Sequence, residues 1–365
     1  MKREPFVTHT PVLLVGSVPL DNAEEVFRTA GELVGDRVEA LPDGETGDRH
    51  QWITFLALRT YYMHPQLDSL QRPAAVGGEE QWIPSSHGDH WQFRVKPGVT
   101  DLHFEDLRYA GAALSSYLTF RELKEKGVIP PHVRFQVSLP FPWSGTLLFF
   151  TQALDDLPQV VSAYERALVR EIQKLMLAIP ADELSIQFDV CLELLALEGV
   201  FPFVPPGDAL ERFAGWCELL AADIPENVRL GYHFCYADLG HRHIKEPEDL
   251  APSVRMANTA VASSRRRVDY VHMAVPRDRH DDAYFQPLAA LNAPDTTPYL
   301  GLVHITDGID GTRRRMRTAR AHLPHFGIAT ECGFGRRPPQ QVDELLRLHA
   351  ALSSHQPVGQ DEQSG

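Results

Sequence analysis

The sequence predicts an α/β protein that folds as one (βα)8 barrel, the TIM barrel. Three observations lead to this fold class. Short apolar runs rich in β-forming residues alternate with amphipathic stretches along the 365 residues, which is the pattern of a parallel α/β protein. Eight such runs can be counted, and most are almost continuously apolar, as strands buried on both faces are. The chemically reactive side chains follow these runs, at the strand ends where barrels carry their active sites.

The eight expected strands are spaced along nearly the whole chain. The clearest helix between them is Leu157–Met176, because its apolar residues recur three or four positions apart. An open doubly wound sheet is the alternative for the same alternation, but eight regular repeats favour closure into a barrel. The expected strands are Val12–Gly16, Arg37–Leu41, Arg134–Leu139, Leu184–Asp189, Arg229–Phe234, Val268–Ala274, Tyr299–His304 and Gly327–Thr330.

One connection is far longer than the others. Residues 43–112 separate the second and third expected strands and are rich in Gly, Pro, His and Trp. Loops of this length are uncommon in compact domains, so we expect an inserted lid or subdomain there. Residues 1–352 are therefore expected to form a single barrel with that insertion. Residues 353–365 are polar and are expected to form a disordered tail.

The composition argues against several classes of protein. The net charge of −14, from 35 basic and 49 acidic residues, repels phosphate backbones, so nucleic acid is not an expected partner. No apolar run is long enough for a membrane helix or a signal-peptide core, so we expect a cytoplasmic protein without a membrane partner. Thiols stay reduced in the cytoplasm. The four cysteines are therefore interpreted as metal ligands or core residues rather than as disulfides.

His233 and Cys235 carry the strongest chemical signal in the sequence. They are two positions apart at the end of the fifth expected strand, so their side chains point to the same face. One imidazole and one thiolate begin a zinc site, and Cys332 after the eighth strand would supply a third ligand. The residues alone leave a second interpretation open, in which these side chains only pack in the core. Cys191 and Cys217 are interpreted as core residues.

Five short blocks, in order along the chain, resemble one known family. They are similar to blocks of the C-terminal catalytic domain of cobalamin-independent methionine synthase, whose barrel superfamily includes uroporphyrinogen decarboxylase. The resemblance runs from about residue 10 to residue 350, and the region 43–112 is poorly matched. The blocks are Val15–Pro19, similar to the first-strand loop; Asp43–Thr46, which resembles H-G-E-P; Ile186–Asp189, which resembles I-Q-x-D; Gly231–Asp238, which resembles H-x-C-Y-x-D; and Thr330–Gly333 with Arg337, which resemble D-C-G-x-x-x-R.

The resemblance implies roles for seven residues. In the family, the H-x-C pair and the terminal Cys bind a zinc ion that activates a homocysteine thiol, and these positions are His233, Cys235 and Cys332 here. The family's first-strand loop holds the substrate carboxylate, and two acids hold its ammonium group. Amide and hydroxyl donors suit a carboxylate, and carboxylates suit an ammonium. The implied substrate-binding residues are Val15 through its backbone, Ser17, Glu45 and Asp189.

Two departures from the family's pattern concern the fourth zinc ligand and the catalytic acid. The family's fourth zinc ligand is a Glu near the end of the sixth strand, and Val268–Ala274 contains no Glu. His272 faces inward on that strand and is the expected substitute ligand, with a core histidine as the alternative. After the seventh strand the family has a His thought to protonate the methyl carrier, and Asp307 takes that position here. Asp307 or His304 is therefore the expected catalytic acid, unless Asp307 only caps the following helix.

These residues predict a zinc-dependent transferase of the methyltransferase type. A thiol, such as that of homocysteine, would attack a methyl or alkyl donor, and zinc would generate the nucleophile. The expected partners are thus a small thiol amino acid and an alkyl donor. One alternative is a zinc-dependent lyase or hydrolase of a specialised metabolite on the same barrel. Another is a protein that binds zinc or a ligand without catalysis.

Overall fold

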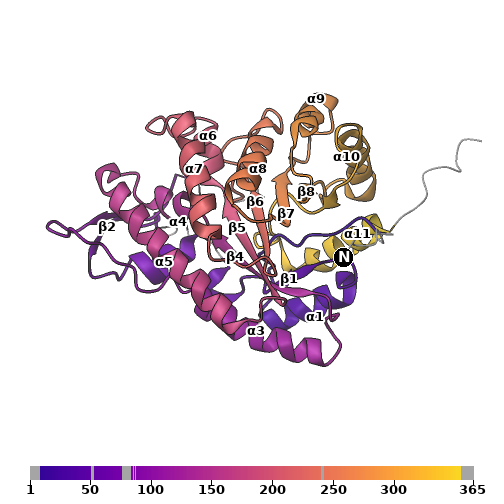
Figure 1. The fold of residues 1–365 in the computed structure, drawn as a ribbon, viewed down its shortest axis with the longest axis horizontal. Coiled ribbons are helices and arrows are strands. Elements are labelled where there is room, and N and C mark those ends of the chain that lie inside the picture. Colours follow the sequence, from indigo (N-terminus) through magenta and orange to yellow (C-terminus); the bar gives the residue numbers. More distant parts are fainter. Residues whose placement is uncertain are drawn as a thin grey trace, which may run out of the picture.

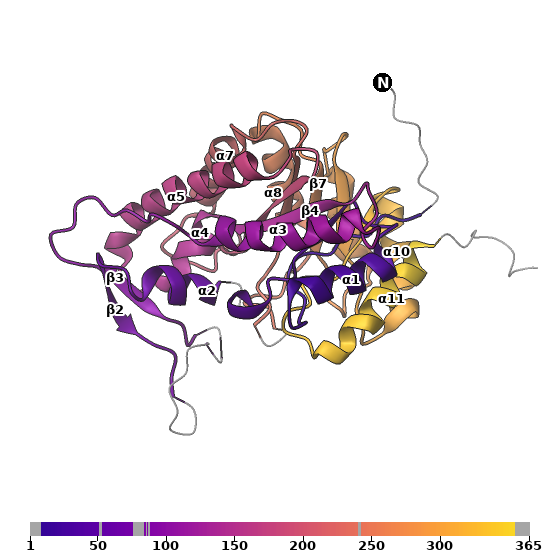
Figure 2. The ribbon, with the colours of Figure 1, turned by 90° about the horizontal axis from the view of Figure 1, so that it is seen from below.

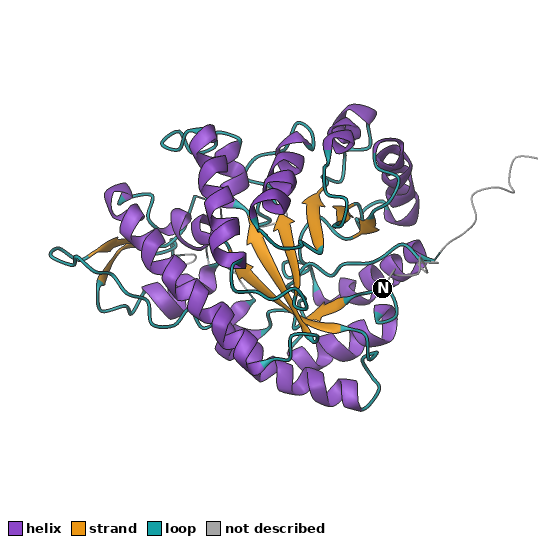
Figure 3. Ribbon diagram, in the orientation of Figure 1, coloured by secondary structure: helices purple, strands orange, loops and turns teal. Residues whose placement is uncertain are grey.

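Seven parallel strands form one curved sheet, and each overlaps one of the expected strands (Figures 1 and 3). The structure is a computed structural model that describes residues 9–50, 53–75, 84, 86, 88–239 and 242–354. The sheet order follows the chain, and every neighbouring pair is parallel. The strands are β1 (Ala40–Pro42), β4 (Arg134–Pro140), β5 (Leu184–Val190), β6 (Arg229–Phe234), β7 (Tyr270–Ala274), β8 (Thr297–Gly301) and β9 (Gly327–Ile328).

The first expected strand, Val12–Gly16, is not a regular strand, but its start joins the two ends of the sheet. Val12 forms parallel bridges to both Val38 and Ile328. The Val12 amide donates to Arg37 O at 3.0 Å, and the Leu13 amide donates to Ile328 O at 3.0 Å. This short segment therefore lies between the region before β1 and strand β9. The predicted barrel class is confirmed, with an eighth position filled by a few residues rather than a full strand.

Helices cover the outside of the sheet, as Figures 1 and 2 show. Helix α1 packs against α3 and α11, α3 packs against α5, and α7 packs against α8. Every residue of β5 and β6 is buried, because their inner faces meet in the barrel and their outer faces lie under helices. The main helices are α1 (Ala23–Val34), α3 (Tyr109–Glu125), α5 (Leu157–Ala178), α6 (Leu192–Leu197), α7 (Pro206–Ala221), α8 (Ala251–Ser263), α9 (Asp282–Phe285), α10 (Gly308–His322) and α11 (Val342–Ser353).

The region expected to be an insertion carries a small antiparallel sheet of its own. It consists of β2 (Leu67–Gln71) and β3 (Gln92–Val95), which lie at one side of the barrel (Figure 2). A buried tyrosine, Tyr61, fastens the region to the barrel, since its hydroxyl donates to Gly145 O at 2.7 Å. Its ring packs on four phenylalanines, Phe93, Phe104, Phe149 and Phe150. Helix α3 begins at Tyr109, close to the expected end of the insertion at residue 112.

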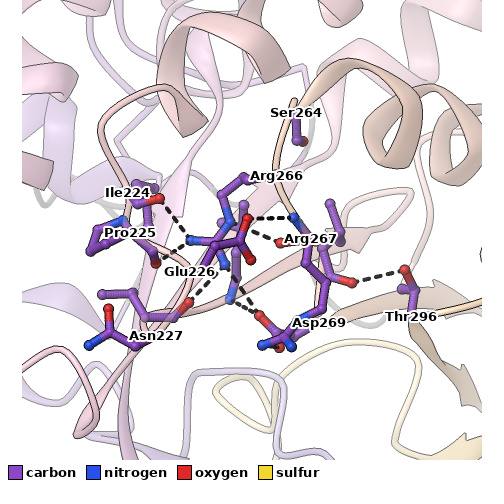
Figure 4. Close-up of polar contacts among 12 residues, drawn as sticks. Ile224, Pro225, Glu226, Asn227, Ser264, Arg266, Arg267, Asp269 and Thr296 are labelled. Carbon is purple, nitrogen blue, oxygen red and sulfur yellow. Dashed lines mark hydrogen bonds and ion pairs between the residues drawn. The ribbon is translucent and has the colours of Figure 1, made fainter.

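The guanidinium of Arg266 connects the loops at the N-terminal ends of β6 and β7 through hydrogen bonds (Figure 4). Arg266 donates to the carbonyl oxygens of Ile224, Pro225 and Val228 at 2.7–3.0 Å, and it lies 3.5 Å from Asp269. Asp269 in turn accepts from the Leu230 amide at 2.9 Å. In this fold the N-terminal face of the strands serves stability, whereas chemistry belongs to the opposite face. We therefore interpret this network as structural.

The two ends of the described chain lie together. The Thr10 amide donates to Ser353 O at 3.0 Å, and the Ser353 hydroxyl donates to Thr10 O at 2.6 Å. Ser353, the first residue of the expected tail, is thus the last residue of α11, and residues 355–365 lie outside the described residues. No helix of the described residues is long and apolar enough to cross a membrane.

Candidate metal centre

Three predicted ligands meet at the C-terminal end of the strands. His233 lies on β6, Cys235 follows β6 directly, and Cys332 lies in the loop after β9. Their ligand atoms all lie within 4.8 Å of one another, and His233 Nε2 is 3.8 Å from Cys332 Sγ. His233 and Cys235 are buried, and Cys332 is partly exposed. Within the described part of the chain, these three side chains form a group that could hold a metal ion.

A chain of hydrogen bonds decides which nitrogen of His233 faces the thiols. His272 Nε2 lies 3.0 Å from the carbonyl oxygen of Thr330, which can only accept, so we assign the proton of His272 to Nε2. Burial lowers the pKa of His272 to about 3, so the ring is neutral and Nδ1 carries a lone pair. That Nδ1 is 2.7 Å from His233 Nδ1, which must therefore donate. The remaining lone pair of His233 is on Nε2, beside Cys332.

The pKa values of these groups describe a site that must lose protons to bind a cation. Burial, and then the neighbouring His272, lower the pKa of His233 well below its usual range, so the imidazole is neutral and can serve as a metal ligand. A hydrogen bond with Cys191 raises the pKa of Cys235, and burial adds to it. A hydrogen bond with Cys235, together with burial, raises the pKa of Cys332. A metal ion would have to displace the thiol protons.

The donor set fits zinc. One neutral imidazole and two thiolates are soft or borderline ligands, which favour zinc over magnesium or calcium. A ligating histidine normally donates its other ring N–H to a fixed acceptor, and His233 Nδ1 has such an acceptor in His272. The chemistry of the three side chains and the orientation of the imidazole thus agree with the predicted zinc ligands.

His272 itself lies outside this group of three. It is in register with His233 on the neighbouring strand and is fully buried, as its inward position on β7 predicts. Both of its ring nitrogens are already in hydrogen bonds, one to His233 and one to Thr330. This geometry argues against the prediction that His272 is the fourth ligand. It supports a role in orienting His233 instead.

One cavity brings the metal group and the predicted substrate-binding residues together. The cavity opens to solvent, and its empty volume with the open mouth included is about 910 Å³. The predicted residues come from five different strand ends or loops. The predicted residues that line this cavity are Val15, Ser17, Glu45, Asp189, His233, Cys235 and Cys332.

Glu45 is aimed into the cavity by the turn that precedes it. Its φ of +52° lies in the left-handed region, which is uncommon for a residue with a side chain. The Asp43 carboxylate holds this turn, since Oδ1 accepts from the Glu45 amide at 2.9 Å. Arg49 binds the same carboxylate, with Nη2 2.5 Å from Asp43 Oδ2. Asp43 thereby stabilises the backbone shape that places Glu45.

Asp189 and Ser17 are positioned by close neighbours around the cavity. The side-chain Nε2 of Gln187 donates to Asp189 Oδ1 at 2.8 Å, and the Tyr270 hydroxyl donates to Gln187 Oε1 at 3.0 Å. Ser17 lies directly against Gly333, where an added Cβ would be only 2.5 Å from Ser17 Oγ. The glycine after Cys332 therefore lets the first-strand loop approach the metal group.

Glu45 and Asp189 form an acidic pair on the cavity wall. Burial, and then the charge of Asp189, raise the pKa of Glu45 well above its usual range. A cation placed between two carboxylates favours their charged forms. The pair is thus suited to a ligand that carries an ammonium group.

The two predicted acids do not line this cavity. Asp307 is bound by Arg315 through two hydrogen bonds of 2.8 and 2.7 Å. Although partial burial opposes ionisation, Arg315 lowers the pKa of Asp307, so the group is a carboxylate at neutral pH and carries no proton to donate. His304 is buried, its Nε2 lies 2.9 Å from Val275 O, and burial lowers its pKa to about 4. Its Nδ1 is 3.8 Å from Glu331.

Some cavity residues had a weak signal or none in the sequence. Cys191 lines the cavity, although the sequence favoured a core role, and its position two residues after Asp189 was the available signal. Asp238 and Arg336 also line it. Next to the cavity, His243 Nε2 is 3.5 Å from Glu331 Oε2. Burial alone would lower the pKa of His243, but hydrogen bonds to Glu331 and Glu246 raise it to about 9.

Comparison with known proteins addresses the fold. No family model matches the sequence, and no curated protein matches it significantly. A B12-independent methionine synthase from Shewanella sp. W3-18-1, solved in complex with selenomethionine, is similar with a TM-score of 0.61 and 13% identity, over 95% of this chain and 96% of that one. A putative vitamin-B12 independent methionine synthase from Listeria monocytogenes is similar with a TM-score of 0.53 and 13% identity, over 96% and 99% of the two chains. This chain therefore has a barrel fold like that of B12-independent methionine synthases, in a highly divergent sequence.

Proposed function

We propose that this chain is a zinc-dependent transferase that moves a methyl or alkyl group onto the thiol of a small amino acid such as homocysteine. The observation that carries the proposal is the shared cavity. A potential zinc group and an acidic pair suited to an ammonium face the same space. The similar Shewanella protein, a B12-independent methionine synthase solved with selenomethionine, has the same fold and supports this class of ligand.

Each of the seven predicted residues that line the cavity has a role in this proposal. Glu45 and Asp189 bind the ammonium group, and Ser17 with the Val15 backbone binds the carboxylate, which directs the thiol toward His233 and the two cysteines. When bound, zinc would stabilise the thiolate form of the substrate sulfur at neutral pH. Asp307 and His304 are left out as proton donors, because neither lines the cavity.

The remaining space of the cavity would receive the alkyl donor. Apolar side chains also line the cavity, among them Ile53 from the insertion, Leu192 at the start of α6 and Ile244 from the loop after β6. Apolar walls exclude water from a charged nucleophile, which strengthens electrostatic effects in the site. The insertion after β1 thus contributes to the binding of the second reactant in this proposal.

The test compares zinc content with thiol binding. The purified chain, Cys332→Ser and Cys217→Ser are assayed for bound zinc and titrated with homocysteine and with homoserine, which lacks the thiol. Cys217 is the matched control, because it is a fully buried thiol on α7 that does not line the cavity. We expect one zinc per chain in the wild type and in Cys217→Ser, little in Cys332→Ser, and homocysteine binding that requires zinc.

Two results would contradict the proposal. If the wild type neither retains nor rebinds zinc, the site argument fails. If zinc binds but homocysteine and homoserine bind equally, the metal does not engage a thiol, and a zinc-dependent lyase or hydrolase becomes the better interpretation. Methyl transfer itself is then followed with methylated donors of different polarity, by mass spectrometry of the product thioether.

A further inference from the structure

The three predicted ligands leave one position of a four-coordinate zinc ion open. Structural zinc sites are closed by four protein ligands, and catalytic ones keep a position for water or substrate. His272, the ligand expected from sequence, has both nitrogens engaged elsewhere. Ala274, at the end of the same strand, carries no donor atom. A fourth protein ligand, where one exists, has to come from another element around the cavity.

The strand register brings Cys191 beside Cys235. In the parallel pair β5–β6, Asp189 lies opposite His233 and Val190 lies opposite Phe234. The Cys235 amide donates to Val190 O at 3.2 Å, which continues the pairing just beyond both strands. The next residues in this register are Cys191 and Cys235. Because side chains alternate along a strand, Cys191 continues the inward row of Asp189, as Cys235 continues that of His233.

Contacts agree with this register. Cys191 is the first cause of the raised pKa of the Cys235 thiol, which agrees with two thiols that are neighbours in this register. Cys191 is buried and lines the cavity together with the three predicted ligands. Three thiols from three different segments of the chain therefore line one cavity with one imidazole, an arrangement that core packing does not require.

The backbone of Cys191 is fixed while its thiol remains adjustable. Ser144 Oγ accepts from the Cys191 amide at 2.9 Å and donates to Glu193 Oε2 at 2.6 Å, which anchors the start of α6. The cysteine side chain has a single rotatable bond before its sulfur. The Cys191 sulfur is not among the ligand atoms that lie within 4.8 Å of one another, so ligation by Cys191 requires rotation about that bond.

We infer that Cys191 is a third sulfur ligand, which completes a Cys3His set with His233, Cys235 and Cys332. This inference rests on the proposed zinc site. It predicts a resting metal centre with three thiolates, and therefore one more negative charge than the His and two Cys ligands alone would give. It also implies that a substrate thiol has to take the place of a protein ligand or add to a full shell.

Zinc X-ray absorption of the wild type and of Cys191→Ser tests the inference, because Zn–S distances of about 2.3 Å are resolved from Zn–N distances of about 2.0 Å. We expect three sulfurs and one nitrogen in the wild type and two sulfurs in Cys191→Ser. Zinc affinity, measured by competition with a chelator, should be lower in Cys191→Ser than in the wild type. The loss should exceed about 10–100-fold, which is typical when a residue that only hydrogen-bonds to a metal ligand is replaced. Cys217→Ser is the control and should match the wild type in both measurements.

The outcomes separate this inference from the proposed function. A wild type that binds zinc through two sulfurs, with Cys191→Ser unchanged, would overturn the inference alone, and the cavity residue Asp238 would become the candidate fourth ligand. A wild type that binds no zinc would overturn both. Cys191→Ala provides the second variant if Cys191→Ser folds poorly, and cobalt substitution gives an independent count of thiolates from the near-ultraviolet charge-transfer absorption.

Discussion

Replacement of His272 by Ala tests the role that the structure gives this residue. The change removes two buried hydrogen bonds, one of 2.7 Å with His233 and one of 3.0 Å with Thr330. It leaves a buried donor and a buried acceptor without partners, and each such group costs about 1–3 kcal/mol. We expect the free energy of unfolding to fall by about 2–6 kcal/mol in total. Because His233 loses the partner that orients it, zinc affinity should fall about 10–100-fold.

Two comparison variants make the measurement specific. His272→Gln keeps one acceptor and one donor on its side chain, so it should recover part of both losses. His349→Ala removes a buried histidine on α11 whose Nδ1 bonds to Leu345 O at 2.7 Å and which does not line the cavity. It should lower stability without changing zinc affinity.

The assays are urea unfolding, zinc competition with a chelator, and zinc X-ray absorption. If His272 only hydrogen-bonds to His233 and does not bind zinc, the zinc in His272→Ala should keep its one nitrogen neighbour. If that variant binds zinc as tightly as His349→Ala does, the orienting role is refuted. If zinc in the wild type has two nitrogen neighbours and His272→Ala has one, His272 is a direct ligand and the hydrogen-bond argument is wrong.

Three further predictions follow from the described contacts. Glu45→Gln should weaken homocysteine binding about 10–100-fold with zinc content unchanged, because a hydrogen bond to a charged group contributes that much affinity. Calorimetric titration measures this loss. If the substitution weakens the binding of a thiol acid without an amino group by the same factor, the role of Glu45 in ammonium binding is contradicted. Arg266→Ala should lower the free energy of unfolding by about 3–5 kcal/mol, because it breaks a buried charge network on the face opposite the cavity; urea unfolding that shows less than about 1 kcal/mol would refute the structural role. Buried His349 and His304 have pKa values of about 4, below the usual 6.5, so the unfolded chain binds more protons and stability should fall as the pH drops below 6.5. Each histidine should contribute a loss of about 1 kcal/mol between pH 7 and 5.5, and His349→Gln should show a correspondingly smaller loss.

Local patterns in the sequence were enough for the architecture. A strand in a parallel sheet is an apolar run, and the sheet uses each expected strand after the first in chain order. The first expected strand was harder, because only Val12 forms bridges there. Its role depends on backbone hydrogen bonds to Arg37 and Ile328, which are distant in sequence, and a search for periodicity does not find such partners.

The sequence by itself also determined that His233 and Cys235 share a face, since alternation along a strand has a period of two. Only the tertiary structure decided what surrounds them. His272 occupies a position on its strand that points inward, as a ligand would, but the register of β6 and β7 places its Nδ1 against His233. Asp307 follows its strand as an active-site acid would, but Arg315, from the next helix, binds its carboxylate. The face to which a side chain points is a property of one strand, whereas its hydrogen-bond partners depend on how several elements pack. That packing determines which reactive side chains remain available for chemistry.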